Sequence, residues 1–177
     1  AHLLHETMPD LRLHGSTQMM VHNSAGVRYL QQMGIKRAVL ARETSLEAIQ
    51  TIISENLMEI ETFVHGALCV AYSGACLLSS MIGGRSGNRG QCAQPCRLNY
   101  QLVDKQGQNL RYDVGGSYLL STRDLSMLSH LPALIDSGIA SLKIEGRMKR
   151  PEYVAIVVKQ YRQAIDQYYR TGQLTVT

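Results

Sequence analysis

Four cysteines, the only ones among 177 residues, lie close together in one irregular segment of the chain: Cys69, Cys76, Cys92 and Cys96. Thiolates are soft ligands for zinc and for iron-sulfur clusters, so four thiols in one segment predict a metal site. Structural zinc sites favour two ligand pairs with two to four intervening residues, and only the second pair here has that spacing. A disulfide framework and unpaired structural cysteines stay open as alternatives.

Basic residues form two local clusters in a chain of net charge +4. Three arginines lie among the cysteines, and four further basic residues lie at the end of the last predicted strand and just after it: Arg85, Arg89, Arg97, Lys143, Arg147, Lys149 and Arg150. Such clusters suit a partner rich in phosphate or carboxylate groups, although a solvated basic face has the same composition. No run of 18 apolar residues occurs, so no membrane span is predicted.

Short apolar runs alternate with helical patterns along the chain. The predicted strands cover residues 11–16, 38–41, 59–65, 118–121 and 140–144. Helices are predicted from an N-cap at Asn23 to Gly34, from a capping box at Thr44 and Glu47, over residues 125–135, and from Pro151 onwards. With 45% hydrophobic and 18% charged residues, the composition is that of a globular domain.

Five strand-to-helix alternations predict an α/β fold with a parallel sheet, either doubly wound or barrel-like, over residues 1–177. Two excursions interrupt it, a cysteine-rich loop at 66–97 and a small β-hairpin at 98–113. Five units do not close an eight-stranded barrel. Because the chain starts inside what reads as a helix or loop, we expect it to be part of a longer protein.

Reactive groups in such folds gather beyond the carboxyl ends of the strands. The candidates at these positions are Ser16, Thr17, Gln18, Arg42, Glu43, His65, Thr122, Arg123, Asp124, Glu145 and Arg147. A carboxylate, an imidazole and several guanidinium groups facing one crevice would hold an anionic substrate. Each also has a structural explanation when taken singly: Glu43 as a partner of Arg42, Asp124 at a helix N-terminus, and His65 as a core histidine.

Several sequence blocks resemble those of a known family. The stretch ETFVHGALCVAYSGACLLS, with the first two cysteines, resembles the signature of the U32 peptidases, the collagenase-like group. Further blocks are similar too, including RGQCAQPCR, STRDL and SLKIEGRMKRPEYVA, so the resemblance covers nearly the whole chain. It implies a TIM-like barrel whose first strands lie upstream of Ala1. It also implies an oxygen-sensitive 4Fe-4S cluster, with Cys69, Cys76, Cys92 and Cys96 as its ligands.

The resemblance also implies an activity. The family name records proteolysis, yet better-understood relatives hydroxylate RNA, and this chain is most similar to the bacterial proteins that make 5-hydroxyuridine at the tRNA wobble position with prephenate required. We therefore expect a cytoplasmic tRNA hydroxylase that uses prephenate and does not bind a membrane. Whether a homologous partner subunit takes part stays open. The alternatives are a U32 collagenase-like endopeptidase and a non-catalytic iron-sulfur scaffold.

Under this expectation the candidate residues divide by role. His65, Glu145 and Arg147 would line the active crevice as catalytic residues. Prephenate is a dicarboxylate and tRNA a polyphosphate, so polar and basic groups would bind substrate. These substrate-binding candidates are Gln18, Arg42, Glu43, Arg85, Arg89, Lys143 and Lys149.

Overall fold

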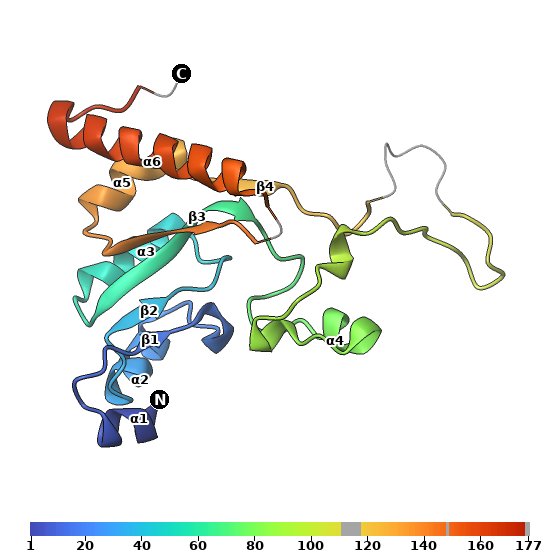
Figure 1. Cartoon of the computed structure of the whole chain (residues 1–177), viewed down its shortest axis with the longest axis horizontal. Helices are drawn as coiled ribbons and strands as arrows, with labels where there is room; N and C mark the ends of the chain where they lie inside the picture. The colour runs from blue at the N-terminus through green and yellow to red at the C-terminus, as the bar shows by residue number, and fades with distance from the viewer. Residues whose placement is uncertain (111–117, 148, 176–177) are drawn as a thin grey trace.

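A five-stranded mixed sheet forms the centre of the molecule (Figure 1). This computed structural model describes residues 1–110, 118–147 and 149–175. The strands are β1 (His14–Gly15), β2 (Arg37–Val39), β3 (Glu59–Ala67), β4 (Asp124–Ser126) and β5 (Ser141–Glu145). β1, β2, β3 and β5 are parallel, whereas β4 runs antiparallel to β3.

The central strand, β3, pairs with three other strands. Its first three residues pair with β2, its last three pair with β4, and β5 pairs from Glu61 to Gly66. A strand has only two edges, and the β5 pairing overlaps both of the others, so β2 and β4 must share the opposite edge. The carboxyl end of β3 therefore lies between β4 and β5, and the cysteine-rich segment begins there.

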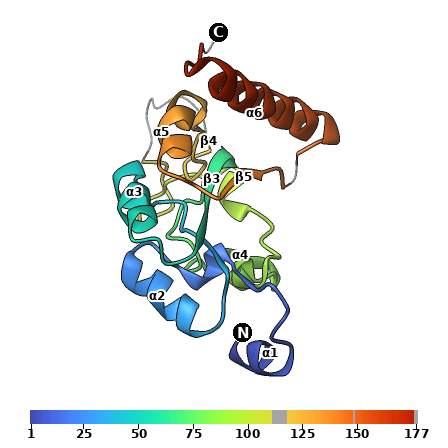
Figure 2. The same cartoon turned by 90° about the vertical axis from the view of Figure 1, so that its left-hand side faces the viewer.

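Three helices lie along one side of the sheet, as Figure 2 shows: α2 (Ser24–Gln32), α3 (Leu46–Ser54) and α5 (Leu131–Asp136). The first two begin at polar caps, because the side chains of Asn23 and Ser45 accept hydrogen bonds from first-turn N–H groups. The long helix α6 (Pro151–Thr171) begins at a proline, which has no N–H to leave unpaired there. The short α1 (His2–Thr7) precedes β1.

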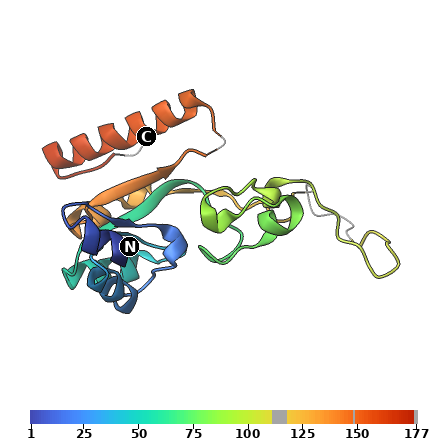
Figure 3. The same cartoon turned by 60° about the horizontal axis from the view of Figure 1, so that its bottom comes forward.

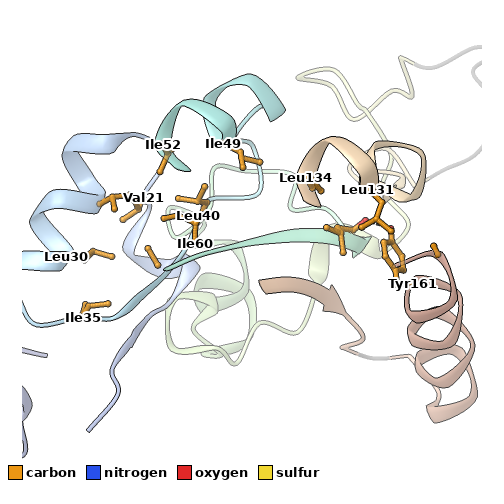
Figure 4. Close-up of a cluster of buried hydrophobic side chains, with 14 of the residues drawn as sticks. Val21, Leu30, Ile35, Leu40, Ile49, Ile52, Ile60, Leu131, Leu134 and Tyr161 are labelled. Carbon is orange, nitrogen blue, oxygen red and sulfur yellow. The ribbon is translucent and has the colours of Figure 1, made fainter. Parts of the chain in front are cut away.

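The hydrophobic core fills the space between the sheet and these helices (Figure 4). Apolar residues at helical spacing on α2 and α3 meet the alternate apolar residues of β3. α5 adds Leu131 and Leu134, both fully buried, and α6 adds Val157, Tyr161 and Ala164. One core thus fixes the strand ends from which the candidate site residues project.

Tyr161 joins α6 to the sheet through its hydroxyl group, which donates to the Val64 carbonyl at 2.7 Å and accepts from the Met127 N–H at 3.2 Å. We expect Tyr161→Phe to lower the free energy of unfolding by about 0.5–1.5 kcal/mol, because the hydrogen bonds of the hydroxyl group are lost. The loss stays this small because the Met127 N–H still donates to the Val64 carbonyl. Urea denaturation measures the change. Tyr169→Phe, on the same helix but 73% exposed, is the matched control, and equal loss in both would contradict this role.

Most predicted elements are confirmed, with shifted ends. The strand at 59–65 appears as β3 and extends to Ala67, and the helix starts at Asn23 and Pro151 are confirmed. The capping box at Thr44 is wrong by one residue. Ser45 caps α3 instead, since its hydroxyl accepts the Ala48 N–H at 3.2 Å.

The predicted strand at 118–121 is wrong. These residues form a turn, in which the Ser121 N–H donates to the Tyr118 carbonyl at 3.1 Å. The strand lies further on, at β4, inside the predicted helix at 125–135, because those residues pair with the free edge at the end of β3. The helix begins only at Leu131, beside a proline in its first turn.

The predicted α/β class is confirmed, but the described residues form no closed barrel, and the antiparallel β4 departs from the predicted parallel sheet. Of the predicted hairpin at 98–113, one antiparallel bridge forms, between Val103 and Asn109, and residues 111–113 lie outside the described ranges. Residues 98–110 project from the body (Figure 3). Among the described helices, none is long and apolar enough to cross a membrane.

Candidate functional site

All four cysteines line a single cavity of about 120 Å³, which we name the cysteine cavity. One wall is the segment after β3, with its short helices α4 (Leu78–Gly83), η2 (Gly87–Arg89) and η3 (Pro95–Arg97). The opposite wall comes from the sheet. Four residues of this wall, at or just after the ends of β1, β2 and β5, have a predicted catalytic or substrate-binding role: Gln18, Arg42, Glu145 and Arg147. The structure thus brings the four predicted metal ligands together with these four residues.

Side-chain hydrogen bonds fix the cysteine-rich segment where helices and strands do not. The buried Ser79 hydroxyl accepts the Ala93 N–H at 2.9 Å, which connects the two halves of the segment. The Tyr100 hydroxyl donates to the Pro95 carbonyl at 2.9 Å, next to Cys96. Each of these bonds has one end next to a cysteine, at Ala93 beside Cys92 and at Pro95 beside Cys96. The loop therefore positions its thiols through polar contacts.

Arg97 joins the two ends of the same segment. Its Nη2 donates to the Leu68 carbonyl at 2.6 Å, beside the first cysteine, and to the Thr122 hydroxyl at 3.0 Å. The Thr122 hydroxyl in turn donates to the Leu68 carbonyl at 2.8 Å. The Nη1 of Arg97 is buried without a hydrogen-bond partner among the described residues, and the side chain lines the cysteine cavity. This guanidinium group therefore has an N–H donor left for a ligand.

Cys96 responds to its burial and to the groups around it. Burial raises the pKa of the Cys96 thiol above its ordinary value, the nearby Arg97 opposes this rise, and the other three cysteines, through the charge of their thiolate forms, add to it. Across residues 1–110, 118–147 and 149–175, no group of three or more His, Cys, Asp or Glu side chains is placed to hold a metal ion. The thiols share one cavity without forming a closed ligand shell.

An ion pair crosses the sheet side of the cavity. Arg42 Nη2 lies 2.6 Å from Glu145 Oε2, and the guanidinium carbon lies 4.0 Å from the centre of the Phe63 ring. The other carboxylate oxygen of Glu145 accepts the Arg147 N–H at 3.2 Å. Arg42 Nε is buried and has no hydrogen-bond partner among the described residues. The Arg42–Glu145 ion pair is thus held by the Phe63 ring and by the Arg147 N–H, and the Nε–H of Arg42 is left as a donor for a ligand.

Gly66 allows β3 and β5 to approach closely enough to place Glu145. Its φ is +107°, and a Cβ atom there would lie 2.2 Å from the Glu145 carbonyl oxygen. Any side chain would therefore push the Glu145 backbone away from the cavity. The glycine that precedes the first cysteine is required by this contact.

A second hollow of about 350 Å³, which we name the neighbouring cavity, shares Arg42, Leu68 and Cys69 with the cysteine cavity. Glu43 lines it and binds the cysteine-rich segment, since its carboxylate accepts the Ser73 N–H at 2.9 Å and the Ser73 hydroxyl at 2.8 Å. Burial alone would raise the pKa of Glu43, but these hydrogen bonds outweigh it and hold the pKa below its ordinary value. Glu43 is thus an ionised anchor for the loop.

Besides Glu43, five residues with a predicted catalytic or substrate-binding role do not line the cysteine cavity. His65 packs against the Tyr153 and Tyr161 rings of α6, and burial lowers its pKa below the ordinary value. Lys143 pairs with Glu61 at 3.4 Å, and Lys149 pairs with Asp124 at 3.0 Å. The other two are exposed arginines of the cysteine-rich segment, Arg85 and Arg89.

Arg97 and Tyr72 line these cavities and were not among the predicted site residues. Arg97 is adjacent to Cys96, but in the sequence it looks like any member of a basic cluster. Tyr72 lines the neighbouring cavity and is the one aromatic residue between the first two cysteines. In the sequence, a single aromatic residue among small ones was the feature that could have identified Tyr72 as a site residue.

Comparisons with known proteins agree with the motifs. The profile of Peptidase family U32 matches residues 1–176. The chain is 44% identical over 163 residues to tRNA hydroxylation protein P1 of Bacillus subtilis, a match over 90% of this chain and 39% of that protein. It is also 44% identical over 164 residues to the 23S rRNA 5-hydroxycytidine C2501 synthase of Escherichia coli, covering 93% of this chain and 25% of that protein.

A relative with a proteolytic name is similar too. The chain is 37% identical over 169 residues to a protein named Collagenase from Porphyromonas gingivalis, a match over 89% of this chain and 40% of that protein. The chain thus spans between a quarter and two fifths of the length of these three relatives. No solved structure matches it significantly. The family match along almost the whole chain confirms the predicted family, and the chain belongs to peptidase family U32.

Proposed function

We propose that this protein hydroxylates a pyrimidine base in RNA, and that its substrate is the wobble uridine of tRNA, which becomes 5-hydroxyuridine. The observation that carries the proposal is the cysteine cavity, where four thiols share one space with Arg42 and Arg147. Relatives named as tRNA and rRNA hydroxylation enzymes support the same reaction. Hydroxylation replaces C–H by C–OH, a two-electron oxidation, so the reaction needs a source of one oxygen atom and an acceptor of two electrons.

A 4Fe-4S cluster is proposed as the resident cofactor, with Cys69, Cys76, Cys92 and Cys96 as its ligands. The donor chemistry of the cavity fits it, because four thiolates are the usual ligand set and each cysteine lines the same space. The unpaired Nη1 of Arg97 also fits, since such clusters accept N–H hydrogen bonds at sulfur. When bound, the cluster would supply one-electron redox chemistry beside the substrate.

Prephenate is proposed as the co-substrate. It carries two carboxylates, and arginine binds carboxylates through paired N–H donors. Arg42 has a buried Nε donor free of partners among the described residues, and Arg147 lines the same cavity. These two guanidinium groups would orient a dicarboxylate against the thiols. The exposed Arg85 and Arg89 would contact RNA phosphates nearby.

Peptide hydrolysis is the weaker alternative. It requires an activated nucleophile, paired carboxylates or a metal-bound water. Over the described ranges, no histidine hydrogen-bonds a serine or cysteine, His65 packs on α6, and the buried Ser73 and Ser79 hydroxyls are engaged in holding the loop. The polar groups of the cavity favour redox chemistry on a bound anion.

The test is a nucleoside analysis of a strain that lacks the gene. Total tRNA and 23S rRNA are digested and quantified by mass spectrometry in the deletion strain, with and without the wild-type gene. We expect the deletion strain to lack 5-hydroxyuridine in its tRNA and the wild-type gene to restore it. A strain blocked in prephenate synthesis should lack the same nucleoside. Loss of an rRNA nucleoside instead would move the substrate to rRNA, and unchanged nucleosides in both RNAs would contradict RNA hydroxylation.

A further inference from the structure

We propose that the neighbouring cavity receives the target pyrimidine base, and that the ring of Tyr72 stacks on that base. This inference rests on the proposed function, because it names where the RNA base lies. The cavity is lined by residues of three segments, namely the loop after β2, the cysteine-rich segment and the turn before β4: Arg42, Glu43, Leu68, Cys69, Val70, Ala71, Tyr72 and Thr122.

The position of this cavity is the first reason. It shares Arg42, Leu68 and Cys69 with the cysteine cavity, so the two spaces meet at the first thiol and at the proposed anion-binding arginine. A base bound in one would lie beside the redox group and the co-substrate bound in the other. At about 350 Å³, it lies within the range of small-ligand pockets.

The exposed aromatic ring is the second reason. Tyr72 is 76% exposed although it lines a cavity, and the neighbouring Val70 is also exposed. Enzymes that act on a base take it out of the stack and hold it between aromatic and apolar side chains. Stacking on an aromatic ring is worth about 1–3 kcal/mol per base.

The backbone that carries Tyr72 is fixed on both sides. The next residue, Ser73, is bound by the Glu43 carboxylate through its N–H and its hydroxyl. On the other side, the Leu68 carbonyl accepts hydrogen bonds from Arg97 and Thr122. An exposed ring on an anchored loop is a prepared stacking surface, because little backbone ordering is required when a base binds.

The polar edge of the cavity suits a pyrimidine. Uracil and cytosine each present both hydrogen-bond donors and acceptors on the edge that pairs with another base. Arg42 offers only donors, and the ionised Glu43 offers only acceptors, because each carboxylate oxygen keeps a second lone pair beside its hydrogen bond from Ser73. This pair could therefore satisfy either base, while the apolar Leu68, Val70 and Ala71 complete the wall.

Binding of oligouridylate to the purified protein tests the proposal, with an abasic strand of equal length as the probe for backbone contacts alone. We expect Tyr72→Ala to weaken oligouridylate binding roughly 5- to 150-fold, which is about 1–3 kcal/mol, and to leave binding of the abasic strand unchanged. Tyr72→Phe should bind nearly as wild type. Tyr169→Ala, an equally exposed tyrosine on α6 that lines neither cavity, is the matched control.

The outcomes separate this inference from the proposed function. Iron content is measured on every variant, so that a damaged cysteine segment is recognised. Wild-type binding of oligouridylate by Tyr72→Ala, or equal affinity of the wild-type protein for the abasic strand, would overturn the base pocket alone. A wild-type protein that binds no RNA would overturn RNA hydroxylation, and the base pocket with it.

Discussion

Cys96→Ser is expected to abolish both the bound iron and the modified nucleoside. Cys96 lines the cavity with the other three thiols and is influenced by all of them. A cluster held by four thiolates loses one ligand, and the chain has no fifth cysteine to replace it. Iron should fall from about four atoms per chain toward none, and the variant gene should restore no 5-hydroxyuridine to the deletion strain.

Met81→Ser is the matched control for this loss. Met81 lies on α4 in the same cysteine-rich segment, and it is 81% exposed. It does not line the cysteine cavity, so its replacement should leave iron and nucleoside at wild-type levels. If Cys96→Ser restores the nucleoside as fully as Met81→Ser does, the thiol has no part in the reaction.

Arg97→Met is expected to weaken cluster retention about 10- to 100-fold, the usual cost of losing a residue that orients metal ligands. The change removes the charged hydrogen bonds to Leu68 and Thr122 and leaves a side chain of similar length. The reduction potential should also become more negative, because a positive charge and an N–H donor near the cluster favour the reduced form. Iron release to a chelator and an anaerobic redox titration measure the two effects.

Arg89→Met provides the comparison for Arg97→Met. Arg89 is an exposed arginine on η2 and lines neither cavity, so the same loss of charge should change neither iron release nor potential. A role of Arg97 in general folding alone would accelerate iron release but leave the potential of the remaining cluster unchanged. Equal behaviour of the two variants would show that Arg97 does not support the site.

The sequence predicted the elements with strong local signals. The apolar run of β3, the N-cap at Asn23 and the proline start of α6 are fixed by residues next to them in the chain. β4 was not predicted because its partner is the end of β3, more than fifty residues earlier, and because three residues are too few to show a strand pattern. Pairing across such a distance overrides local propensity.

The site, too, was predicted only in part. The clustering of the cysteines along the chain identified the thiols, and the strand-end rule correctly selected four residues that line the same cavity: Gln18, Arg42, Glu145 and Arg147. The same rule selected His65, but β3 continues past it and its ring packs on α6. The rule also does not reveal the anchoring role of Glu43, which was chosen as a substrate contact and whose carboxylate binds Ser73.

The central claim is that these four cysteines hold an iron-sulfur cluster. Purification without oxygen, followed by quantification of iron, acid-labile sulfide and zinc per chain, tests it most directly. The account predicts about four iron and four sulfide per chain, with no zinc. One zinc per chain, or no metal under strictly anaerobic conditions, would contradict it and return peptide hydrolysis to first place.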